Sequence, residues 1–441
     1  MNSYIPLTTD ERQRMMQAVG VQTLDELFDD IPPAARLAQP LDIPSMGEVQ
    51  LMGMMGRLAA KNVTDAPIFL GAGAYRHYIP ATVQTIISRS EFLTAYTPYQ
   101  AEMSQGLLQS IFEYQSMICN LTGMEVSNAS VYDGATACAE AMGMARNAKR
   151  KAVFAASAAL HPDVLATLHT YAHAWGIELR IIPAKDGVTD IAGNAALLEG
   201  AAGMLFAQPN FYGCLEDVDA ISAAAEAADA LRIAMVNPIS LGLLKQPGSY
   251  ADIAVGDGQS LGNAISFGGP GLGFMATTKK YMRNLPGRIV GKSTDADGNT
   301  GYLLTLQARE QHIRRDKAAS NICSNQALNA LSVAVYLATV GDEGLRQTAV
   351  VCHANAQYLK EKIAALPGYS VAFSAHTFHE FVIQCPVPAA QINDALLTAN
   401  IIGGLDLAPY ELDHCMLLCC TEVNTKDDMD ALTAILEEVG K

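Results

Sequence analysis

The stretches RIAMVNP, residues 232–238, and ADIAVGDGQS, residues 251–260, decide the fold expected for this chain. Each begins with an apolar run of strand length and ends in polar or small residues. Similar runs occur at residues 152–155, 178–182 and 204–207, and Ala-rich helical stretches lie between them, at residues 162–171 and 218–226. Alternation of this kind predicts an α/β fold with a mostly parallel central sheet that helices cover on both faces.

The regions on either side of this pattern differ from it. Residues 1–60 are predicted to be a helical N-terminal segment, with a capping signal at Thr8 and a second short helix expected from Thr23. We expect this segment to wrap the body or a partner. Residues 61–318 are expected to form the large α/β domain, and residues 319–441 a smaller α+β domain. Helices are expected in that domain at residues 325–339, 345–366, 389–400 and 426–439, and a strand at residues 380–384.

The bulk composition limits the classes of partner. The 441 residues carry a formal net charge of -16, which argues against nucleic acid and anionic membranes. No secretory signal and no apolar run of membrane-spanning length is visible, so a cytoplasmic protein is expected. The nine cysteines show no paired CxxC spacing. His414 and Cys415 with Cys419 and Cys420 would suggest a metal site, but the apolar run from Met416 to Cys420 is interpreted as a buried strand. We therefore expect no metal site.

Ligands in sheets of this kind bind outside the carboxyl ends of the strands, and two strand ends are informative. In fold-type I pyridoxal-phosphate (PLP) enzymes an Asp at the first end pairs with the pyridinium nitrogen, and a Lys shortly after the second holds the cofactor. Here Asn237 stands at the first position and Ser260 at the lysine position, and no lysine occurs between Lys245 and Lys279. The sequence predicts a PLP-type sheet without its own cofactor chemistry; the alternative is that another lysine serves.

Two other strand ends are candidates for ligand contacts. Asp133 is expected to cap a helix whose first turn, Gly134, Ala135 and Thr136, leaves backbone N–H groups open for a phosphate, as a vestigial phosphate cup. The alternative is an ordinary helix start with small residues for packing. The loop QPNFYG at residues 208–213 also follows a strand, and it is equally consistent with a simple turn.

Longer motifs along most of the chain resemble the glycine dehydrogenase (decarboxylating) family, the P-proteins of the glycine cleavage system. They are FLGAGAYRHYIP (69–80), AYTPYQAEMSQG (95–106), NASVYDGATA (128–137), QPN (208–210), PGRIVG (286–291), REQHIRR (309–315) and SNIC (320–323). The resemblance is to subunit 1 of the split enzymes, which is similar to the N-terminal half of the single-chain form.

This resemblance implies a fold-type I large domain and a partner-dependent enzyme. A PLP-bearing subunit 2 would complete it as an α2β2 heterotetramer. Glycine would be decarboxylated there, and the aminomethyl group would pass to the lipoyl group of H-protein. The resemblance also implies candidates for the partner's site or its substrate channel: His77, Tyr96, Tyr99, Gln100, Glu102 and Gln105. The alternative for these residues is an ordered interface loop with satisfied hydrogen bonds.

A basic block stands out in this acidic chain, and it comprises Arg309, His312, Arg314, Arg315 and Lys317. It would attract acidic H-protein or a carboxylate, or else it is solvated or paired with Glu310 and Asp316. The function of the whole chain also has alternatives: a self-sufficient PLP-dependent aminotransferase or decarboxylase with a displaced lysine, or a non-catalytic scaffold of the same fold.

Overall fold

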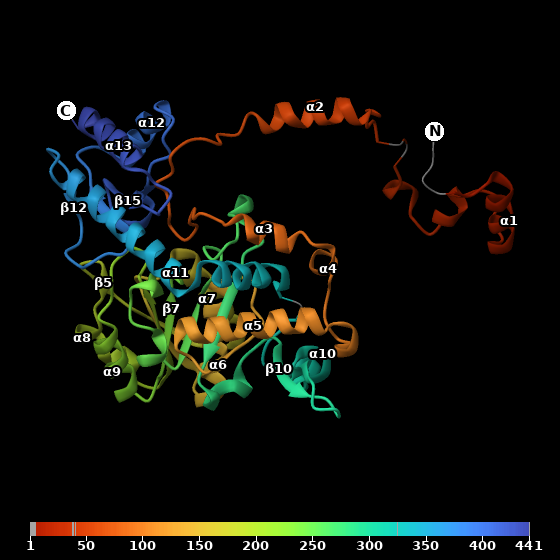
Figure 1. Ribbon diagram of the computed structural model, residues 1–441, viewed down its shortest axis with the longest axis horizontal. Coiled ribbons are helices and arrows are strands. Elements are labelled where there is room, and N and C mark those ends of the chain that lie inside the picture. Colours follow the sequence, from red (N-terminus) through yellow and green to blue (C-terminus); the bar gives the residue numbers. More distant parts are fainter. Residues whose placement is uncertain (1–5, 38, 40, 324, 441) are drawn as a thin grey trace. The chain divides into compact units, whose positions relative to one another are not determined.

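The computed structural model describes residues 6–37, 39, 41–323 and 325–440 of the chain (Figure 1). They form two compact units, with the boundary between Asp65 and Ala66. The first unit contains the helices α1 (Thr9–Val19) and α2 (Glu48–Ala59) and two 3-10 turns, Asp25–Phe28 and Pro33–Ala35.

Thr8 begins α1 as predicted from the sequence. Its hydroxyl accepts a hydrogen bond from the backbone N–H of Glu11, whose carboxylate accepts one from the backbone N–H of Thr8, so the pair forms a capping box. The segment that follows Thr23 forms a short 3-10 helix, Asp25–Phe28, where the sequence predicted a second short helix. Packing within the described part of this unit buries none of its residues.

The second unit is built on a seven-stranded sheet with the order β1-β9-β8-β7-β6-β2-β3. The strands are β1 (Val126–Ser127), β2 (Val153–Ser157), β3 (Glu178–Ile182), β6 (Ala201–Gln208), β7 (Leu231–Val236), β8 (Ile253–Asp257) and β9 (Gly273–Thr277). Strands β3, β2, β6, β7 and β8 run parallel to one another. At one edge, β9 pairs with β8 in the antiparallel sense, and β1 pairs antiparallel with β9. The predicted mostly parallel sheet is therefore confirmed.

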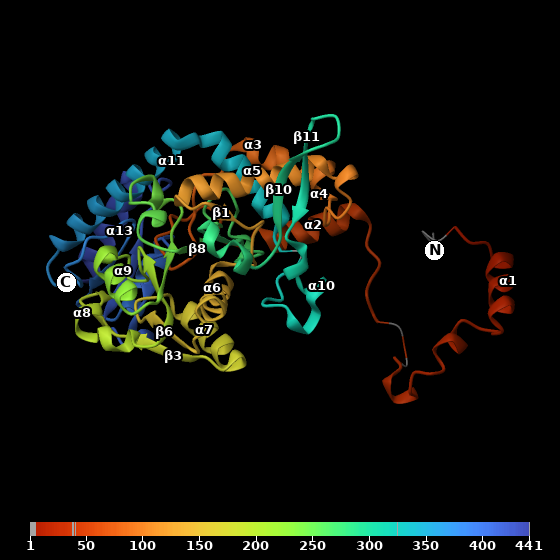
Figure 2. The same cartoon turned by 90° about the horizontal axis from the view of Figure 1, so that it is seen from below.

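Helices cover both faces of this sheet, because its central strands are apolar on both sides. Leu205 packs in one core with α6 (Gly134–Lys149) and α7 (Pro162–Trp175), while the next residue, Phe206, packs in the other core. That second core contains α5 (Gln105–Thr122), α9 (Val218–Ala227) and the first half of α11 (Ala327–Ala364). Figure 2 shows α5 and α11 on the side of the strands opposite to α6 and α7.

The C-terminal part contains a second, antiparallel sheet with the order β12-β13-β15-β14. Its elements are β12 (Ser370–Val371), β13 (Glu380–Gln384), α12 (Ala389–Thr398), β14 (Leu405–Asp406), β15 (Cys415–Cys419) and α13 (Lys426–Val439). All five residues of β15 are buried, which confirms the predicted strand. The two helices expected at 325–366 meet at Gly341, where φ is 65° and the helix bends.

Shorter elements connect the two sheets and border the large one. They are α3 (Ala81–Ile87), α4 (Ser90–Leu93), the 3-10 turn Ala101–Met103, β4 (Ala184–Lys185), β5 (Val188–Thr189), α8 (Ile191–Asn194), the hairpin β10 (Ile289–Thr294) and β11 (Thr300–Thr305), and α10 (Gln311–Arg314). In the part of the chain that the structure describes, no helix combines the length and apolar character needed to cross a bilayer.

Candidate functional site

A cleft of about 530 Å³ opens at the carboxyl ends of the parallel strands. The ends of β6, β7 and β8 line it, together with the first turns of α6 and α7, the segment from Ala72 to Tyr75, and Glu380 of β13. Parallel strands bring their carboxyl ends to one edge of the sheet, so residues far apart in sequence meet there. This is the edge at which the sequence predicted ligand contacts.

Asn237 and Ser260 both line this cleft, as the two strand-end positions require. The Asn237 side-chain oxygen accepts hydrogen bonds from the backbone N–H groups of Ile239 (3.0 Å) and Ser240 (3.3 Å), so it shapes the turn after β7. Its amide nitrogen lies 3.4 Å from Nε2 of His379. An amide carries no charge with which to pair a pyridinium nitrogen. No lysine is among the described residues that line the cleft.

The first turn of α6 differs from the open phosphate cup that the sequence suggested. Asp133 caps the helix as expected, because its carboxylate accepts from the Thr136 N–H at 2.7 Å. A second carboxylate, that of Asp257, accepts from the Gly134 N–H at 3.1 Å and from the Gln259 N–H at 2.8 Å. Two donors that would hold a phosphate are therefore taken by acidic groups of the chain itself.

These residues do not fit PLP. The cofactor needs an amine to hold it, an acid opposite its ring nitrogen and donors for its phosphate. The cleft offers a serine, an asparagine and two carboxylates in the corresponding places, and a phosphate at α6 would meet Asp133 and Asp257. We derive no chemical step through PLP in this cleft.

Glu380 and His161 complete the cleft, and the sequence argument missed both. The buried Glu380 carboxylate accepts from the Ala72 N–H (2.7 Å) and from the Tyr75 hydroxyl (2.8 Å). Nδ1 of His161 accepts from the Asp163 N–H at the start of α7, and Nε2 lies 3.1 Å from the Ala72 carbonyl oxygen. The available signal was local: an acid opens the apolar strand EFVIQ, and a histidine precedes a helix-starting proline.

Glu380 is expected to make the free energy of unfolding fall as pH rises. Burial raises the pKa of this carboxyl from its ordinary 4.5 to about 7, so the folded chain holds a proton that the unfolded chain has released. The stabilisation is fully present below pH 4.5 and is lost as pH rises through about 7. Glu380→Gln cannot ionise and keeps an acceptor for Tyr75, so it should remove roughly 2–3 kcal/mol of this pH dependence.

Urea unfolding at pH 5 and pH 8 measures this effect. A smaller slope should remain in the variant, because burial also raises the pKa of Glu140 to about 7. An identical slope in Glu380→Gln and in the unaltered chain would contradict the assignment to Glu380.

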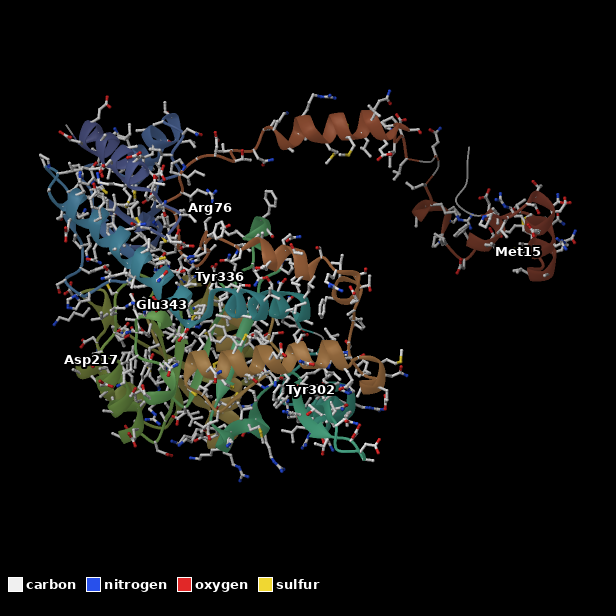
Figure 3. All side chains as sticks on the ribbon, in the orientation of Figure 1. Met15, Arg76, Asp217, Tyr302, Tyr336 and Glu343 are labelled. Atoms are coloured by element: carbon white, nitrogen blue, oxygen red, sulfur yellow. The ribbon has the colours of Figure 1, made fainter. Side chains whose placement is uncertain are left out.

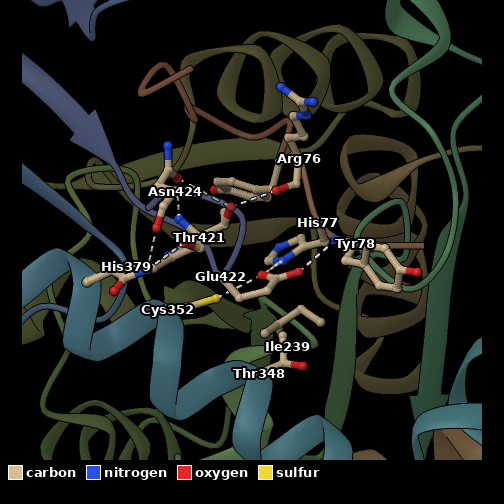
Figure 4. A network of polar contacts seen from close by, with 12 residues as sticks. Arg76, His77, Tyr78, Ile239, Thr348, Cys352, His379, Thr421, Glu422 and Asn424 are labelled. Atoms are coloured by element: carbon tan, nitrogen blue, oxygen red, sulfur yellow. Dashed lines mark hydrogen bonds and ion pairs between the residues drawn. The ribbon is translucent and has the colours of Figure 1, made fainter. Parts of the chain in front are cut away.

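His77 lies away from the residues that line the cleft, in a polar network that Figure 4 shows. Its Nδ1 lies 2.7 Å from Oε2 of Glu422, which also accepts from the Cys352 thiol at 3.3 Å, while Oε1 accepts from the Tyr78 N–H at 2.7 Å. The His77 side chain is 2% exposed. It ties the 67–80 segment to the C-terminal part of the fold, which disfavours the channel role expected for it.

The same three side chains are the group of described residues whose ligand atoms lie within 4.8 Å of one another. Hydrogen bonds account for their approach, because Glu422 is an acceptor toward both His77 and Cys352. The hydrogen bonds therefore explain why these three ligand atoms lie close together.

Tyr96, Tyr99, Gln100 and Glu102 form an exposed surface between α4 and α5, called here the Tyr99 surface. Tyr96 is 77% and Tyr99 55% exposed, and neither lines the cleft. The Tyr99 hydroxyl accepts from Nη2 of the buried Arg288 at 2.8 Å, and the guanidinium carbon lies 5.2 Å from the Tyr99 ring centroid. Four of the predicted residues thus lie together on one exposed segment, and Arg288 holds one of them, Tyr99, in place.

Gln105 has a different task from the one the motif suggested. Its side-chain amide donates to the carbonyl oxygens of Ala101 (2.7 Å) and Tyr302 (2.9 Å), and its oxygen accepts from the Tyr302 N–H at 2.9 Å. Figure 3 labels Tyr302, which belongs to β11. Through these hydrogen bonds Gln105 attaches the β10–β11 hairpin to α5, so its side chain has a structural role in this chain.

Comparisons with known proteins agree over almost the full length of the chain. The family model described as glycine cleavage system P-protein matches residues 2–436. The probable glycine dehydrogenase (decarboxylating) subunit 1 of Prosthecochloris aestuarii is 50% identical, and the match covers 99% of this chain and 100% of that protein. The same identity and coverage hold for the subunit 1 of Desulforamulus reducens.

Solved structures give the same picture of the fold. A crystal structure of glycine decarboxylase (P-protein) of the glycine cleavage system, in inhibitor-bound form, is 41% identical with a TM-score of 0.92, and the match covers 99% of this chain and 100% of that one. A structure of mouse CSAD is 14% identical with a TM-score of 0.69, over 91% of this chain and 90% of that one, and it shows the fold alone. The expected fold-type I architecture of PLP-dependent transferases is confirmed.

Proposed function

The chain belongs to the glycine cleavage system P-protein family, as a subunit 1 of glycine dehydrogenase (decarboxylating), and from this premise we propose that it acts in glycine decarboxylation only together with a PLP-bearing subunit 2. PLP on that partner would supply the electron sink for loss of CO2. The aminomethyl group would then pass to the lipoyl group of H-protein. The assembly we propose is an α2β2 heterotetramer.

The observation that carries this proposal is the cleft of about 530 Å³, which keeps the PLP-type fold without a lysine in its lining. Asn237, Ser260 and the Asp257 carboxylate replace the groups that would bind the cofactor. Losses at three separate points of one site, together with full-length similarity to the family, support a division of labour between subunits over a damaged enzyme.

The Tyr99 surface is the contribution that we assign to this chain. Its side chains project from a segment that Arg288 anchors, so Tyr99 is positioned before any partner binds. Two phenols, an amide and a carboxylate suit contact with the ammonium and carboxylate of glycine or with a lipoyl arm. We propose that this surface completes the partner's substrate channel.

The experiment is to purify this chain alone and after mixing with subunit 2. We expect the chain alone to lack both glycine-decarboxylating activity and the absorbance of lysine-bound PLP, and both to appear with the partner. Borohydride reduction followed by peptide mapping should place the trapped pyridoxyl group on subunit 2. A pyridoxyl-lysine in this chain would instead establish the self-sufficient enzyme.

The variant Tyr99→Phe, tested in the assembled enzyme, distinguishes a contribution to the substrate channel from a purely structural scaffold role. The variant keeps the ring and loses one hydroxyl, so assembly should be unchanged while turnover falls about tenfold or more, if the hydroxyl orients a reacting group. If the Tyr99→Phe and Glu102→Gln assemblies both turn over glycine as fast as the assembly with the unaltered chain, the scaffold role is favoured. Gln109→Glu on α5, an exposed change outside the Tyr99 surface, serves as the control.

A further inference from the structure

A second hollow, of about 410 Å³, lies beside the C-terminal half of α6, and we call it the Arg309 pocket. Its lining contains five cationic side chains and no Asp or Glu: Arg146, Arg283, Arg309, Arg314 and Lys317. The whole chain has 29 Lys and Arg against 45 Asp and Glu. All charged residues in the lining of this hollow are cations, in contrast to the acidic chain as a whole, so a positive electrostatic potential is expected there.

In the described part of the chain, the Glu310 carboxylate attracts one of the five cations, Arg309, electrostatically, but the five form no close ion pairs. None of them is among the ion pairs found there. Glu310, which the sequence offered as a partner for this basic block, faces Arg288 and His312 instead, each at 3.6 Å. It lines an adjoining, smaller hollow with Glu140, and Arg283 and Arg309 line both hollows. Pairing within the chain therefore does not explain the cluster.

Arg309 has buried hydrogen-bond donors that no group of the described chain satisfies. Its Nη1 donates to the Leu285 carbonyl oxygen, but Nε and Nη2 are buried and have no hydrogen-bond partner. Burial lowers the pKa of Arg309 from its ordinary value, which reflects the cost of holding this charge away from water. Buried guanidinium donors are ordinarily satisfied, and the planar fork of Arg matches carboxylate and phosphate oxygens.

We propose that the Arg309 pocket binds a multiply charged oxyanion, with Arg309 at its recessed end and Arg146, Arg283, Arg314 and Lys317 around its mouth. The shared chemistry is that of phosphate and carboxylate groups, whose oxygens accept charge-assisted hydrogen bonds from Arg. The oxyanion is either a free small molecule or an acidic group carried by a partner protein. This site is separate from the cleft and does not depend on the proposed function.

The test uses the full chain and inorganic pyrophosphate as the probe. Isothermal titration calorimetry at constant ionic strength should show saturable binding, with a matching rise in the thermal unfolding temperature. The double variant Arg146→Gln/Arg314→Gln changes two exposed side chains, so it should fold normally and bind pyrophosphate at least tenfold more weakly. Arg309→Met should lose binding as well; because it also removes the hydrogen bond to the Leu285 carbonyl oxygen, its thermal unfolding temperature without ligand is measured in parallel.

The matched control is Arg150→Gln/Lys185→Gln, which removes two exposed positive charges outside the pocket and should bind like the unaltered chain. A parallel titration with an acidic partner protein distinguishes the source of the oxyanion. Loss of that protein's binding in Arg146→Gln/Arg314→Gln, without pyrophosphate binding to the unaltered chain, would assign the site to a carboxylate of a partner. Affinities for both probes that are equal in the double variant and its control would overturn the proposal.

Discussion

Replacing Arg288 with methionine is expected to lower the free energy of unfolding by about 3–5 kcal/mol. The Arg288 side chain is buried, and it donates to the Cys323 carbonyl oxygen at 2.9 Å and to the Tyr99 hydroxyl at 2.8 Å. Its Nε lies 3.6 Å from the buried carboxylate of Glu310. Removal of the guanidinium leaves that carboxylate with weaker compensation, from Arg309 and from the His312 ring at 3.6 Å, and a poorly compensated buried charge is strongly destabilising.

Urea unfolding at pH 8 measures this loss, and a second variant separates its causes. Arg288→Met/Glu310→Gln removes the unpaired charge, so it should recover most of the lost free energy. Tyr99→Phe removes a single hydrogen bond at the exposed end and should cost about 1 kcal/mol. A loss below about 1 kcal/mol for Arg288→Met would show that the ion pair with Glu310 does not contribute to the free energy of unfolding. Other contacts than those of Arg288 would then have to hold the Tyr99 surface in place.

Removal of residues 1–65 is expected to abolish assembly with the second subunit. Leu51, Met55 and Leu58 recur along α2 at the spacing that places side chains on one helix face, and packing within this unit buries none of them. Val49 on the same helix is 88% exposed and adds to the apolar surface that α2 leaves uncovered within this unit. Buried apolar area contributes about 25 cal/mol per Å², so loss of such a stripe should weaken association by orders of magnitude.

Size-exclusion chromatography of the mixed subunits measures assembly. Because the boundary between Asp65 and Ala66 separates two compact units, the truncated chain should keep its thermal unfolding temperature. Leu51→Ser/Met55→Ser/Leu58→Ser should reproduce the defect, while Glu48→Ser/Gln50→Ser/Arg57→Ser, which changes polar positions of the same helix, should not. Normal assembly of the truncated chain would refute a role in association, and a fall in its unfolding temperature would assign the stripe to this chain's own body.

The parts of the fold that follow from local pattern were predictable. Strands β6 and β7 are apolar over most of their length, from Ala201 to Ala207 and from Ile233 to Val236, and a run of that kind has to be covered on both faces wherever it lies. The strand-end positions were predictable for a related reason, because neighbouring parallel strands deliver their carboxyl ends to one edge. Asn237 and Ser260 therefore line one cleft, although they lie 23 positions apart in sequence.

Contacts between distant segments were not predictable in this way. The open phosphate cup failed as an expectation because Asp257 reaches the Gly134 N–H from a strand 123 positions away. Gln105 was a channel candidate because of the family resemblance of its motif, and its hydrogen bonds to Tyr302 were not visible in the sequence. His77 belongs to the motif next to the cleft, yet Glu422 takes it into a buried network.

The sequence by itself determined the class of fold, the family and the absence of a lysine between positions 245 and 279, since each of these is written in local order or in residue identity. Only the tertiary structure decided which side chains occupy the cleft and which charged groups gather elsewhere on the fold. It placed Asp257 on the helix end, Glu380 308 positions from its donor at Ala72, and five cations around one pocket. The physical reason is that electrostatics and hydrogen bonding depend on distance in space, which chain order does not encode until the sheet has formed.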